Sequence, residues 1–376
     1  MRAAPQGIRR ARTRRGCGGR SHRGRVHRLR RVRAEGRQGA RPADVRLVRV
    51  ANGLEKAAEC PFRYFLEQAL GLEPIEEEES DDDAWLDVAT RGTLLHDLFA
   101  DVMRELRRRH ERPDPKKHLD WLLTRAGQRL AALREEMPPP SPHVFEHERR
   151  QIARDLEMFL HVEAEAAARG VEPIGFEVRF GSRHGDDADA DGASEPIGQA
   201  TPIEVSLGDA TFLLGGRIDR VDRLPDGDYE VVDYKTGSFY RPKYKGVFRG
   251  GRQLQHVLYA LAAEPLLRKQ VDRKARVVSG RYLFPTVVGG GDDKKIPRPP
   301  AAAVEAVLAD LFDTLKAGAF TATPKDEDCK FCEHGRACGT DHGRARLADP
   351  LGRAKTKIEN VENTMLRAFQ RLRKYD

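Results

Sequence analysis

The sequence predicts an α/β fold in which helices flank a mixed central sheet, and a helical N-terminal part is tied back to a cysteine-containing loop near the C-terminus. Three observations lead to this prediction. Helical periodicity dominates the chain up to residue 169, and alternating apolar and β-branched residues, typical of strands, begin at residue 172. Further helical and strand patterns follow after residue 250. Cys60 lies in the first helical segment, and three cysteines, Cys329, Cys332 and Cys338, follow the last strand pattern.

The expected helices come first along the chain. They lie at about 50–72, 91–110, 117–135 and 146–169, with an acidic loop at 73–83 and a proline cluster at 138–142. Expected strands follow at 172–181, 201–208, 210–224 and 228–237; PDGD at 225–228 predicts a turn, and residues 182–198 a mobile loop. The remaining expected elements are a helix at 252–268, a strand at 275–284, a helix at 300–317 and a basic amphipathic helix at 354–375.

Composition limits the class of protein. The chain has 376 residues, 39% of them hydrophobic, which is enough to bury a sizeable core. It contains no run of 18 or more apolar residues, so we expect no membrane-spanning helix. The N-terminus lacks the apolar segment of a signal peptide, so we expect a cytoplasmic protein.

The basic charge is concentrated in an N-terminal arm, residues 1–49. Residues 1–50 contain 17 Arg, with only Glu35 and Asp44 as acids, so they carry +15 and the rest of the chain carries −7 of the total of +8. Such a segment repels itself and buries little, and we expect it to be disordered. Two interpretations stay open: an arm whose Arg side chains neutralise DNA phosphates, or a segment that is not native to the protein.

A carboxylate–lysine group lies on the two strands joined by the PDGD turn, in GGRIDRVDRLPDGDYEVVDYKTG at 215–237. Side chains two apart on a strand share a face, so Asp233 and Lys235 should project together, and the hairpin can bring Asp219 beside Asp233. Adjacent carboxylates favour a hard divalent cation, Mg²⁺ or Mn²⁺, which acidifies a bound water that Lys235 can orient or deprotonate. A surface hairpin with ordinary salt bridges is the alternative.

This hairpin resembles the nuclease domain of the RecB-like branch of the PD-(D/E)XK superfamily, and the resemblance implies catalytic roles for Asp219, Asp233 and Lys235. RGTLLHDLF at 91–99 is similar to the G-x-x-x-H helix of that family, which implies His96 as a catalytic residue and metal ligand beside Asp219 and Asp233. FEVRF at 176–180 implies Glu177 as a further acidic residue. RQLQHVLYALAAE at 252–264 resembles the Q-x-x-x-Y helix, which implies Gln255 and Tyr259.

Each of these added residues also has an ordinary structural interpretation. His96 lies among leucines and can be a core histidine, Tyr259 can be a packing aromatic, and Glu177 can be a solvated strand residue. Their order along the chain, together with the hairpin, favours a common site.

The cysteines form a second pattern. CKFCEHGRAC at 329–338 has the spacing C-x2-C-x5-C, and AECPFRYFL supplies Cys60 near the N-terminus. Four thiolates, those of Cys60, Cys329, Cys332 and Cys338, suit a [4Fe–4S] cluster or Zn²⁺, and spacing alone does not decide between them. Cys17 lies in the arm and has no expected partner.

These four cysteines, called the cysteine site below, resemble the iron–sulfur staple of two PD-(D/E)XK families: the AddB-type subunits of bacterial double-strand-break repair nucleases and the CRISPR-adaptation nucleases. The resemblance implies a [4Fe–4S] cluster, with Zn²⁺ as the alternative. A cross-link over such a long loop restricts the unfolded chain. We expect that without it the N-terminal helix and the C-terminal loop would have little to hold them against the core.

These features predict an arm at 1–49, a nuclease domain at 50–345 and a basic C-terminal helix at 346–376. The expected activity is that of a metal-dependent DNA nuclease, an exonuclease acting in recombination and double-strand-break repair. The chain has no G-x-x-x-x-G-K-[ST] sequence for a Walker ATP site, so we expect a helicase subunit in trans. The alternatives are a CRISPR-adaptation-type nuclease and a non-catalytic DNA-binding scaffold subunit.

Overall fold

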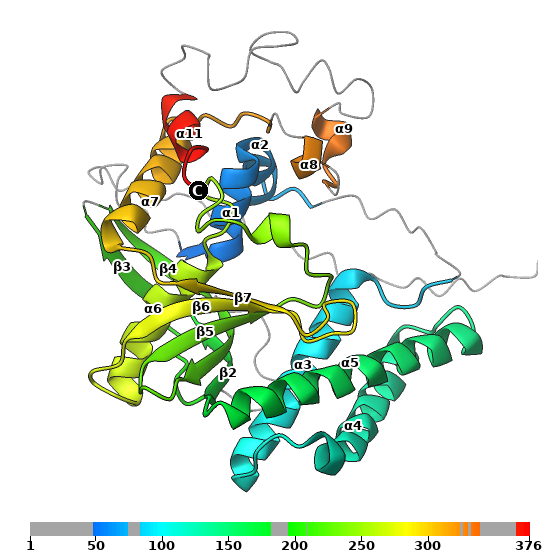
Figure 1. The fold of residues 1–376 in the computed structure, drawn as a ribbon. Coiled ribbons are helices and arrows are strands. Elements are labelled where there is room, and N and C mark those ends of the chain that lie inside the picture. The colour runs from blue at the N-terminus through cyan, green and yellow to red at the C-terminus, as the bar shows by residue number, and fades with distance from the viewer. Residues whose placement is uncertain are drawn as a thin grey trace, which may run out of the picture. The chain divides into compact units, whose positions relative to one another are not determined.

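A seven-stranded mixed sheet forms the centre of the fold (Figure 1). The computed structural model describes residues 48–73, 83–181, 195–208, 210–323, 326–329, 332–338 and 366–376. Residues 1–47 of the Arg-rich arm, including Cys17, and most of the predicted tail helix lie outside the described residues. The strands are β1 (Val48–Val50), β2 (Glu172–Phe180), β3 (Ile203–Leu207), β4 (Ala210–Arg223), β5 (Tyr229–Tyr234), β6 (Val277–Leu283) and β7 (Asp293–Pro297).

The long strand β4 organises the sheet. It pairs antiparallel with β2, β3 and β5 and parallel with β1. On the far side of β5, β6 runs parallel to β5 and β7 runs antiparallel to β6. Parallel neighbours need a crossover, and helix α6 (Gln255–Gln270) supplies it between β5 and β6. The predicted mixed sheet flanked by helices is therefore confirmed.

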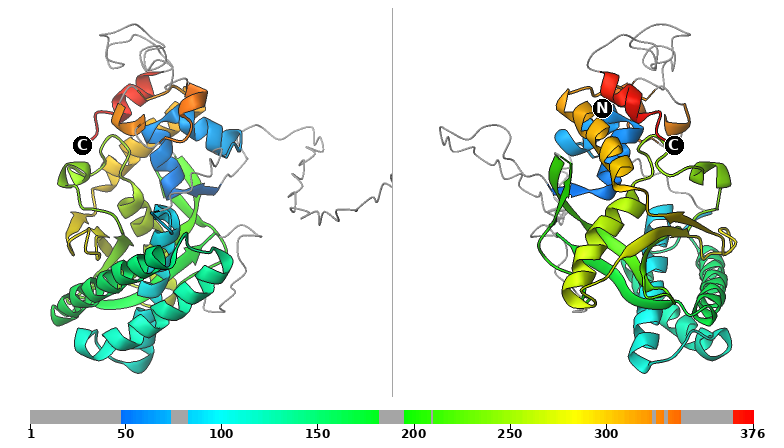
Figure 2. Two further views of the ribbon diagram at one scale, coloured as in Figure 1. Left: turned by 90° about the vertical axis from the view of Figure 1, so that its right-hand side faces the viewer. Right: turned by 60° about the vertical axis from the view of Figure 1, so that its left-hand side comes forward.

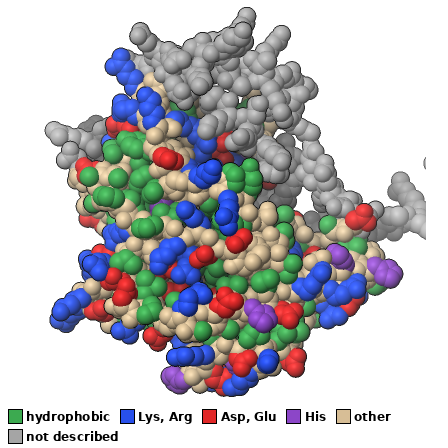
Figure 3. Space-filling view, in the orientation of Figure 1, with side chains coloured by type: hydrophobic (Ala, Val, Ile, Leu, Met, Phe, Trp, Pro, Cys, Tyr) green, Lys and Arg blue, Asp and Glu red, His purple; other side chains and the backbone are tan. Residues whose placement is uncertain are grey.

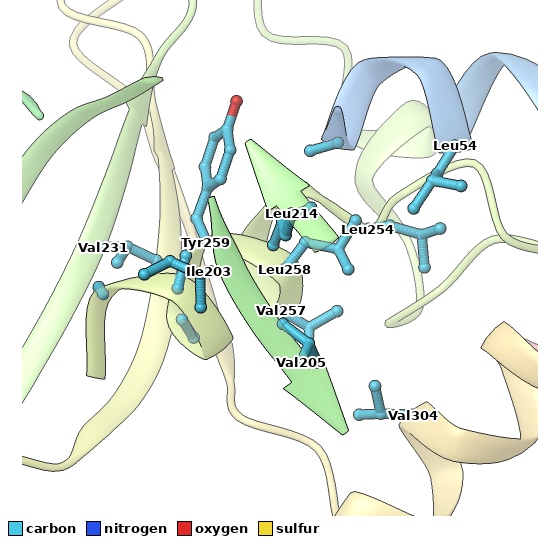
Figure 4. Packing of buried hydrophobic residues seen from close by; sticks show 14 of the residues in the cluster. Leu54, Ile203, Val205, Leu214, Val231, Leu254, Val257, Leu258, Tyr259 and Val304 are labelled. Atoms are coloured by element: carbon cyan, nitrogen blue, oxygen red, sulfur yellow. The ribbon is translucent and has the colours of Figure 1, made fainter. Parts of the chain in front are cut away.

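One hydrophobic core lies between the sheet and the helices α1 (Ala51–Glu59), α6 and α7 (Ala301–Lys316). Figure 4 shows part of this core, with Leu54 of α1, Leu258 of α6 and Val304 of α7 around strand side chains. The C-terminal helix α11 (Arg367–Leu372) adds Phe369 and Leu372 to the same core.

A second core lies on the other face, under α3 (Val88–Arg109), α4 (Pro115–Glu136) and α5 (Pro142–Ala168). Strand β5 serves both cores, because Val231 belongs to the first core while Val232 and Tyr234 belong to the second. Phe99 of α3 and Phe159 of α5 stack with ring centroids 4.1 Å apart. Figure 2 shows α3, α4 and α5 gathered on one side of the sheet from two further directions.

Local sequence explains where these helices begin. Asp87, Asp114 and Ser141 each accept a hydrogen bond from the first turn of α3, α4 and α5, respectively. Proline at the first position of α4 and α5 suits a helix start, because its missing N–H has no partner there in any case. The expected starts at 91, 117 and 146 were too late, since they overlooked these caps.

The predicted helix at 50–72 is divided in the structure. It begins with β1, continues as α1, is interrupted at Cys60, and resumes as α2 (Pro61–Tyr64) and the π-helical turn η1 (Phe65–Ala69). Besides β1, the unexpected short elements include β7, a polar edge strand with only Ile296 buried, and the 3₁₀ turn η2 (Arg241–Tyr244). Near the C-terminus lie α8 (Asp326–Cys329) and α9 (Gly335–Cys338).

The described surface is mixed in character. On the face drawn in Figure 3, Lys and Arg side chains lie among acidic and apolar ones. No helix within the described ranges is long and apolar enough to cross a membrane.

Candidate functional site

Three adjacent strands bring the predicted acidic residues together. Strand β2 pairs Phe176 with Arg220 and Val178 with Ile218, so Glu177 lies opposite Asp219. Strand β5 pairs Val232 with Arg220, so Asp233 is the next residue along, beside Asp219. Opposite residues of antiparallel strands share a face, and Asp219 is therefore flanked by a carboxylate on either side. Its Oδ2 also accepts a hydrogen bond of 2.8 Å from the Tyr234 backbone N–H.

His96 reaches this group from α3. Its Nδ1 lies 3.6 Å from Asp219 Oδ2 and 3.9 Å from Glu177 Oε1. One ligand atom from each of His96, Glu177 and Asp219 lies within 4.8 Å of the others, close enough for a single metal ion. Leu94, Leu95 and Leu98 of the same helix are buried in the core under α3, so the helix is held while His96 is directed at the strands.

Glu177 has an unusual backbone. Its φ is +50°, a conformation that side chains other than glycine rarely adopt, although the register with β4 is the same on both sides of it. Its Oε2 lies 2.7 Å from Arg217 Nε, and its Oε1 is buried and accepts no hydrogen bond within the described residues. Strain of this kind clusters at functional sites.

Lys235 follows β5 directly and continues the pairing with β6, because its N–H donates to Leu283 O at 2.8 Å. Its Nζ lies 2.5 Å from Asp233 Oδ2, so the two side chains project together as the spacing predicted. Nζ also donates to Gln255 Oε1 at 3.1 Å. Asp233 thus faces Lys235, while Glu177 lies with His96 and Asp219.

Gln255 and Tyr259 lie one turn apart at the start of α6. Tyr259 is 9% exposed, and in Figure 4 its hydroxyl points away from the apolar side chains of the core. Burial, then the charges of Asp233 and Asp219, raise the pKa of Tyr259 well above its usual value. The seven predicted site residues therefore come from five segments around the carboxylates: α3, β2, β4, α6, and β5 with the residue that follows it.

The electrostatics of the site favour a bound cation. Burial raises the pKa of Asp219 well above its usual value, and the charges of Asp233 and Glu177 raise it further. Burial lowers the pKa of His96 to about 4, which leaves a neutral ring able to act as a ligand. Burial opposes the charge of Lys235, but Asp233 outweighs it, and the net pKa of Lys235 is raised.

These residues fit a hard divalent ion. The donor set contains carboxylate oxygens and one imidazole nitrogen, and the buried Oε1 of Glu177 has no hydrogen-bond donor within the described residues. A cation here would relieve the mutual repulsion of the carboxylates.

A further residue at the site was missed by sequence reasoning. Glu55 of α1 accepts hydrogen bonds from the N–H groups of Leu254 and Gln255, at 2.5 and 2.8 Å, and so caps α6 from a distant part of the chain. Its sequence context, GLEKAAEC, is that of an ordinary exposed helix, so no local signal distinguished it.

The cysteine site is assembled from both ends of the core. Burial raises the pKa of Cys60, and Cys332 adds to the effect. The pKa of Cys338 is raised to about 11, first by burial and then by the charges of Cys60, Cys332 and Cys329. Cys60 Sγ also accepts a hydrogen bond from Arg63 N–H at the start of α2.

The expectation that only a cluster would hold these segments was wrong. Helix α1 buries Ala51, Leu54, Ala57 and Ala58 in the core. A contact that involves no cysteine also joins the two parts of the chain, because the rings of Phe65 and Phe320 stack with centroids 4.8 Å apart. The C-terminal Arg373 donates to Glu59 O and to Thr323 Oγ1, both at 3.1 Å, and so joins α1 to the chain ahead of α8.

Comparison with known proteins agrees with this geometry. A protein of Symbiobacterium thermophilum, named as a subunit of an ATP-dependent helicase/deoxyribonuclease, is 32% identical over 271 residues, which is 68% of this chain and 21% of the relative. Proteins of the same name from Geobacillus kaustophilus (28% identical; 49% of this chain, 15% of the relative) and Clostridium acetobutylicum (26%; 70% and 21%) are also similar. The chain thus spans about a fifth or less of these relatives.

The family match covers most of the described fold, apart from β1 and α11. Residues 51–339 match the PD-(D/E)XK nuclease superfamily, a range that begins with α1 and ends just after Cys338. It includes each strand and helix that contributes to the carboxylate group. The chain therefore belongs to the PD-(D/E)XK nuclease superfamily.

Proposed function

We propose that this chain hydrolyses phosphodiester bonds in DNA, as a Mg²⁺- or Mn²⁺-dependent exonuclease in recombination and double-strand-break repair. The observation that carries the proposal is the convergence of Glu177, Asp219 and Asp233 with His96 and Lys235 in a chain of this superfamily. The names of the curated relatives favour a role in repair over CRISPR adaptation. An assembled carboxylate–lysine group argues against a purely non-catalytic scaffold.

In this proposal the carboxylates and His96 bind the metal ion, and Lys235 interacts with the phosphate. His96, Asp219 and Asp233, joined by Glu177, would hold the ion, which when bound polarises the phosphate and acidifies a water. Lys235 carries its ammonium next to the same carboxylates, so it stabilises negative charge that develops on the phosphate. Gln255 orients the Lys235 side chain by accepting its hydrogen bond.

Tyr259 and Arg217 lie at the margin of the site. The hydroxyl of Tyr259 points away from the core side chains (Figure 4), and its pKa is raised by burial and by the charges of Asp233 and Asp219, so we assign it to donate to a phosphate oxygen. Arg217 pairs with Glu177 and limits the net negative charge when no ion is bound.

We further propose that Cys60, Cys329, Cys332 and Cys338 bind a [4Fe–4S] cluster, with Zn²⁺ as the alternative. Four buried or half-buried thiols support this proposal: Cys60 between α1 and α2, Cys329 in α8, Cys332 between α8 and α9, and Cys338 in α9. Four thiolates would leave a bound cluster without an open position. Absorbance near 400 nm and iron content after purification without oxygen would distinguish the cluster from stoichiometric zinc.

The domain division is proposed in the same way: an arm at 1–49, a nuclease domain at 50–345 and a basic segment at 346–376. A helicase subunit acting in trans is the proposed partner, because the relatives are named as helicase/deoxyribonuclease subunits. The described end of the basic segment, α11, packs against the core, so its deletion is expected to destabilise the domain.

The test is a nuclease assay on labelled single-stranded and duplex DNA with Mg²⁺ or Mn²⁺, and with EDTA as the metal-free control. Asp233→Asn and Lys235→Ala should each abolish cleavage while thermal melts show a folded protein. Lys274→Ala, at an exposed lysine between α6 and β6, is the matched control and should cleave at the wild-type rate. Cleavage at the wild-type rate by Asp233→Asn would show that the activity does not arise at this site.

A further inference from the structure

A groove of about 600 Å³ opens beside the carboxylate–lysine group. Lys235 and Gln255 line its inner end, so the groove is continuous with the proposed catalytic site. Helix α1 forms one wall, and the segment between β5 and α6, including η2, contributes the other. None of the roles assigned above uses this segment.

Basic side chains outnumber acidic ones in the lining of the groove. Its lining includes five Lys or Arg side chains and three carboxylates. Three of the cations are already paired: Lys56 with Glu67 at 2.5 Å, Lys235 with Asp233 at 2.5 Å, and Arg252 with Asp328 at 2.6 Å. The other two, Lys243 and Arg249, make no ion pair with any residue that the structure describes.

Arg249 has an unfavourable backbone conformation and an unfavourable electrostatic environment. Its φ is +49°, and Gly250 and Gly251, which follow it, also have positive φ. A left-handed conformation is disfavoured for arginine and natural for glycine. Burial and the neighbouring Arg252 lower the pKa of Arg249, so the cation sits half-buried beside another cation. The charges of Asp328 and Glu59 act on this guanidinium, but it forms no ion pair with a carboxylate in the described part of the chain.

An aromatic ring completes the groove. Tyr240 lines it and is 64% exposed, the most exposed aromatic side chain in the described part of the chain. Tyr244 and Tyr282, by contrast, are buried in its wall. An exposed tyrosine next to unpaired cations is the combination with which proteins bind single nucleic-acid strands, because rings stack on bases while cations contact phosphates.

We propose that this groove binds a single DNA strand next to the scissile phosphate, with Tyr240 stacked on an unpaired base and Lys243 and Arg249 paired with backbone phosphates. The proposal rests on the proposed nuclease function and extends it to the path of the strand. A base inside a duplex is already stacked on both faces, so Tyr240 selects an unpaired strand. The strand then runs between α1 and η2 toward Lys235.

The test measures binding of a fluorescein-labelled 12-nucleotide oligo-dT to the full chain by fluorescence anisotropy in EDTA, where no cleavage occurs. Tyr240→Ala should raise Kd about tenfold, and Tyr240→Phe, which keeps the ring, should restore binding. Lys243→Gln/Arg249→Gln should weaken binding and lower the slope of log Kd against log salt by about 1.4, or ~0.7 for each lost phosphate contact.

The matched control is Lys274→Gln/Lys316→Gln, which removes two charges from exposed lysines outside the groove. It should change Kd by less than about twofold at 0.15 M salt, where exposed charges far from the strand are screened. Equal losses in the control pair and the groove pair would overturn the proposal, since the effect would then reflect net charge alone. Equal effects of Tyr240→Ala on a hairpin duplex and on oligo-dT would overturn the single-strand assignment.

The experiments distinguish an error in the strand-binding proposal from an error in the proposed nuclease function. If the wild type cleaves DNA with Mg²⁺ while the groove variants bind and cleave as well as wild type, the groove proposal is wrong and the nuclease function stands. If the wild type does not cleave under any metal condition but the groove variants lose binding as expected, the strand site stands and the proposed activity is wrong.

Discussion

Glu55→Ala tests whether α1 supports the catalytic group. The Glu55 carboxylate accepts two backbone hydrogen bonds at the start of α6, from Leu254 at 2.5 Å and Gln255 at 2.8 Å. Without it, two N–H groups lose their partner at the helix N-terminus. Gln255 in turn accepts the hydrogen bond of Lys235 Nζ, so the change is transmitted to the site.

The expected loss of stability in Glu55→Ala follows from the known cost of removing helix caps. Loss of one N-cap side chain costs about 0.5–2 kcal/mol, so loss of a cap with two hydrogen bonds should lower the free energy of unfolding by about 2 kcal/mol near pH 6. Misplacement of a catalytic group by even a fraction of an ångström is costly, and we expect a fall in kcat of about tenfold with little change in KM. Glu55→Gln keeps an acceptor oxygen and should retain most of the stability and activity.

The pH dependence provides an independent check. Burial raises the pKa of Glu55 from 4.5 to about 7, although both backbone hydrogen bonds lower it. A folded-state pKa above the unfolded value means that the protonated form stabilises the fold at low pH and that this stability is lost as the pH rises from about 4.5 through 7. Glu55→Gln cannot ionise. Its free energy of unfolding should therefore increase relative to that of the wild type as the pH rises over this range.

The assays are urea denaturation between pH 5 and 8, steady-state kinetics, and amide hydrogen exchange of residues 254–258. Glu59→Ala is the matched control, because Glu59 lies one turn later on α1 and also lines the groove but makes no hydrogen bond to α6. The reasoning is refuted if Glu55→Ala leaves exchange at 254–258 and kcat unchanged, or if Glu59→Ala produces the same effects.

Three further predictions concern stability and metal binding. Arg220→Met should lower the free energy of unfolding by about 3–5 kcal/mol in urea titrations, because Arg220 is buried among Glu163, Asp222 and Tyr234 and its loss leaves two buried carboxylates unpaired; a loss under 1 kcal/mol would contradict this. Asp219→Asn should raise the melting temperature in EDTA, because it removes a charge repelled by Asp233 and Glu177, whereas only the wild type should gain stability on addition of Mg²⁺; a wild-type melting temperature unaffected by Mg²⁺ or Mn²⁺ would argue against the metal site. Cys60→Ala should increase proteolysis within 326–338 but leave exchange in α1 low, because α1 is anchored by its buried side chains; rapid exchange throughout α1 would instead mean that the cysteine site holds the helix.

The sequence alone determined the elements whose patterns are local. Alternation along β4 and β5 and the short PDGD turn predicted the hairpin, and a two-residue spacing was enough to place Asp233 and Lys235 on one face. His96, Glu177, Gln255 and Tyr259 could be named in advance because a known family carries similar residues in the same order. Helix starts were less well predicted, although Asp114–Pro115 and Ser141–Pro142 are local signals that could have located them.

Only the tertiary structure decided how distant segments meet. Glu55 caps a helix that lies far along the chain, and Arg220 is paired with Glu163 of α5. Lys243 and Arg249, which form no ion pair within the described ranges, line a groove formed with α1. In sequence each of these is an ordinary charged residue. Whether a charge is solvated, buried in a pair or left without a partner depends on which chain segments fold against it, and that information is absent from the local pattern because the contacts join residues that are remote in sequence.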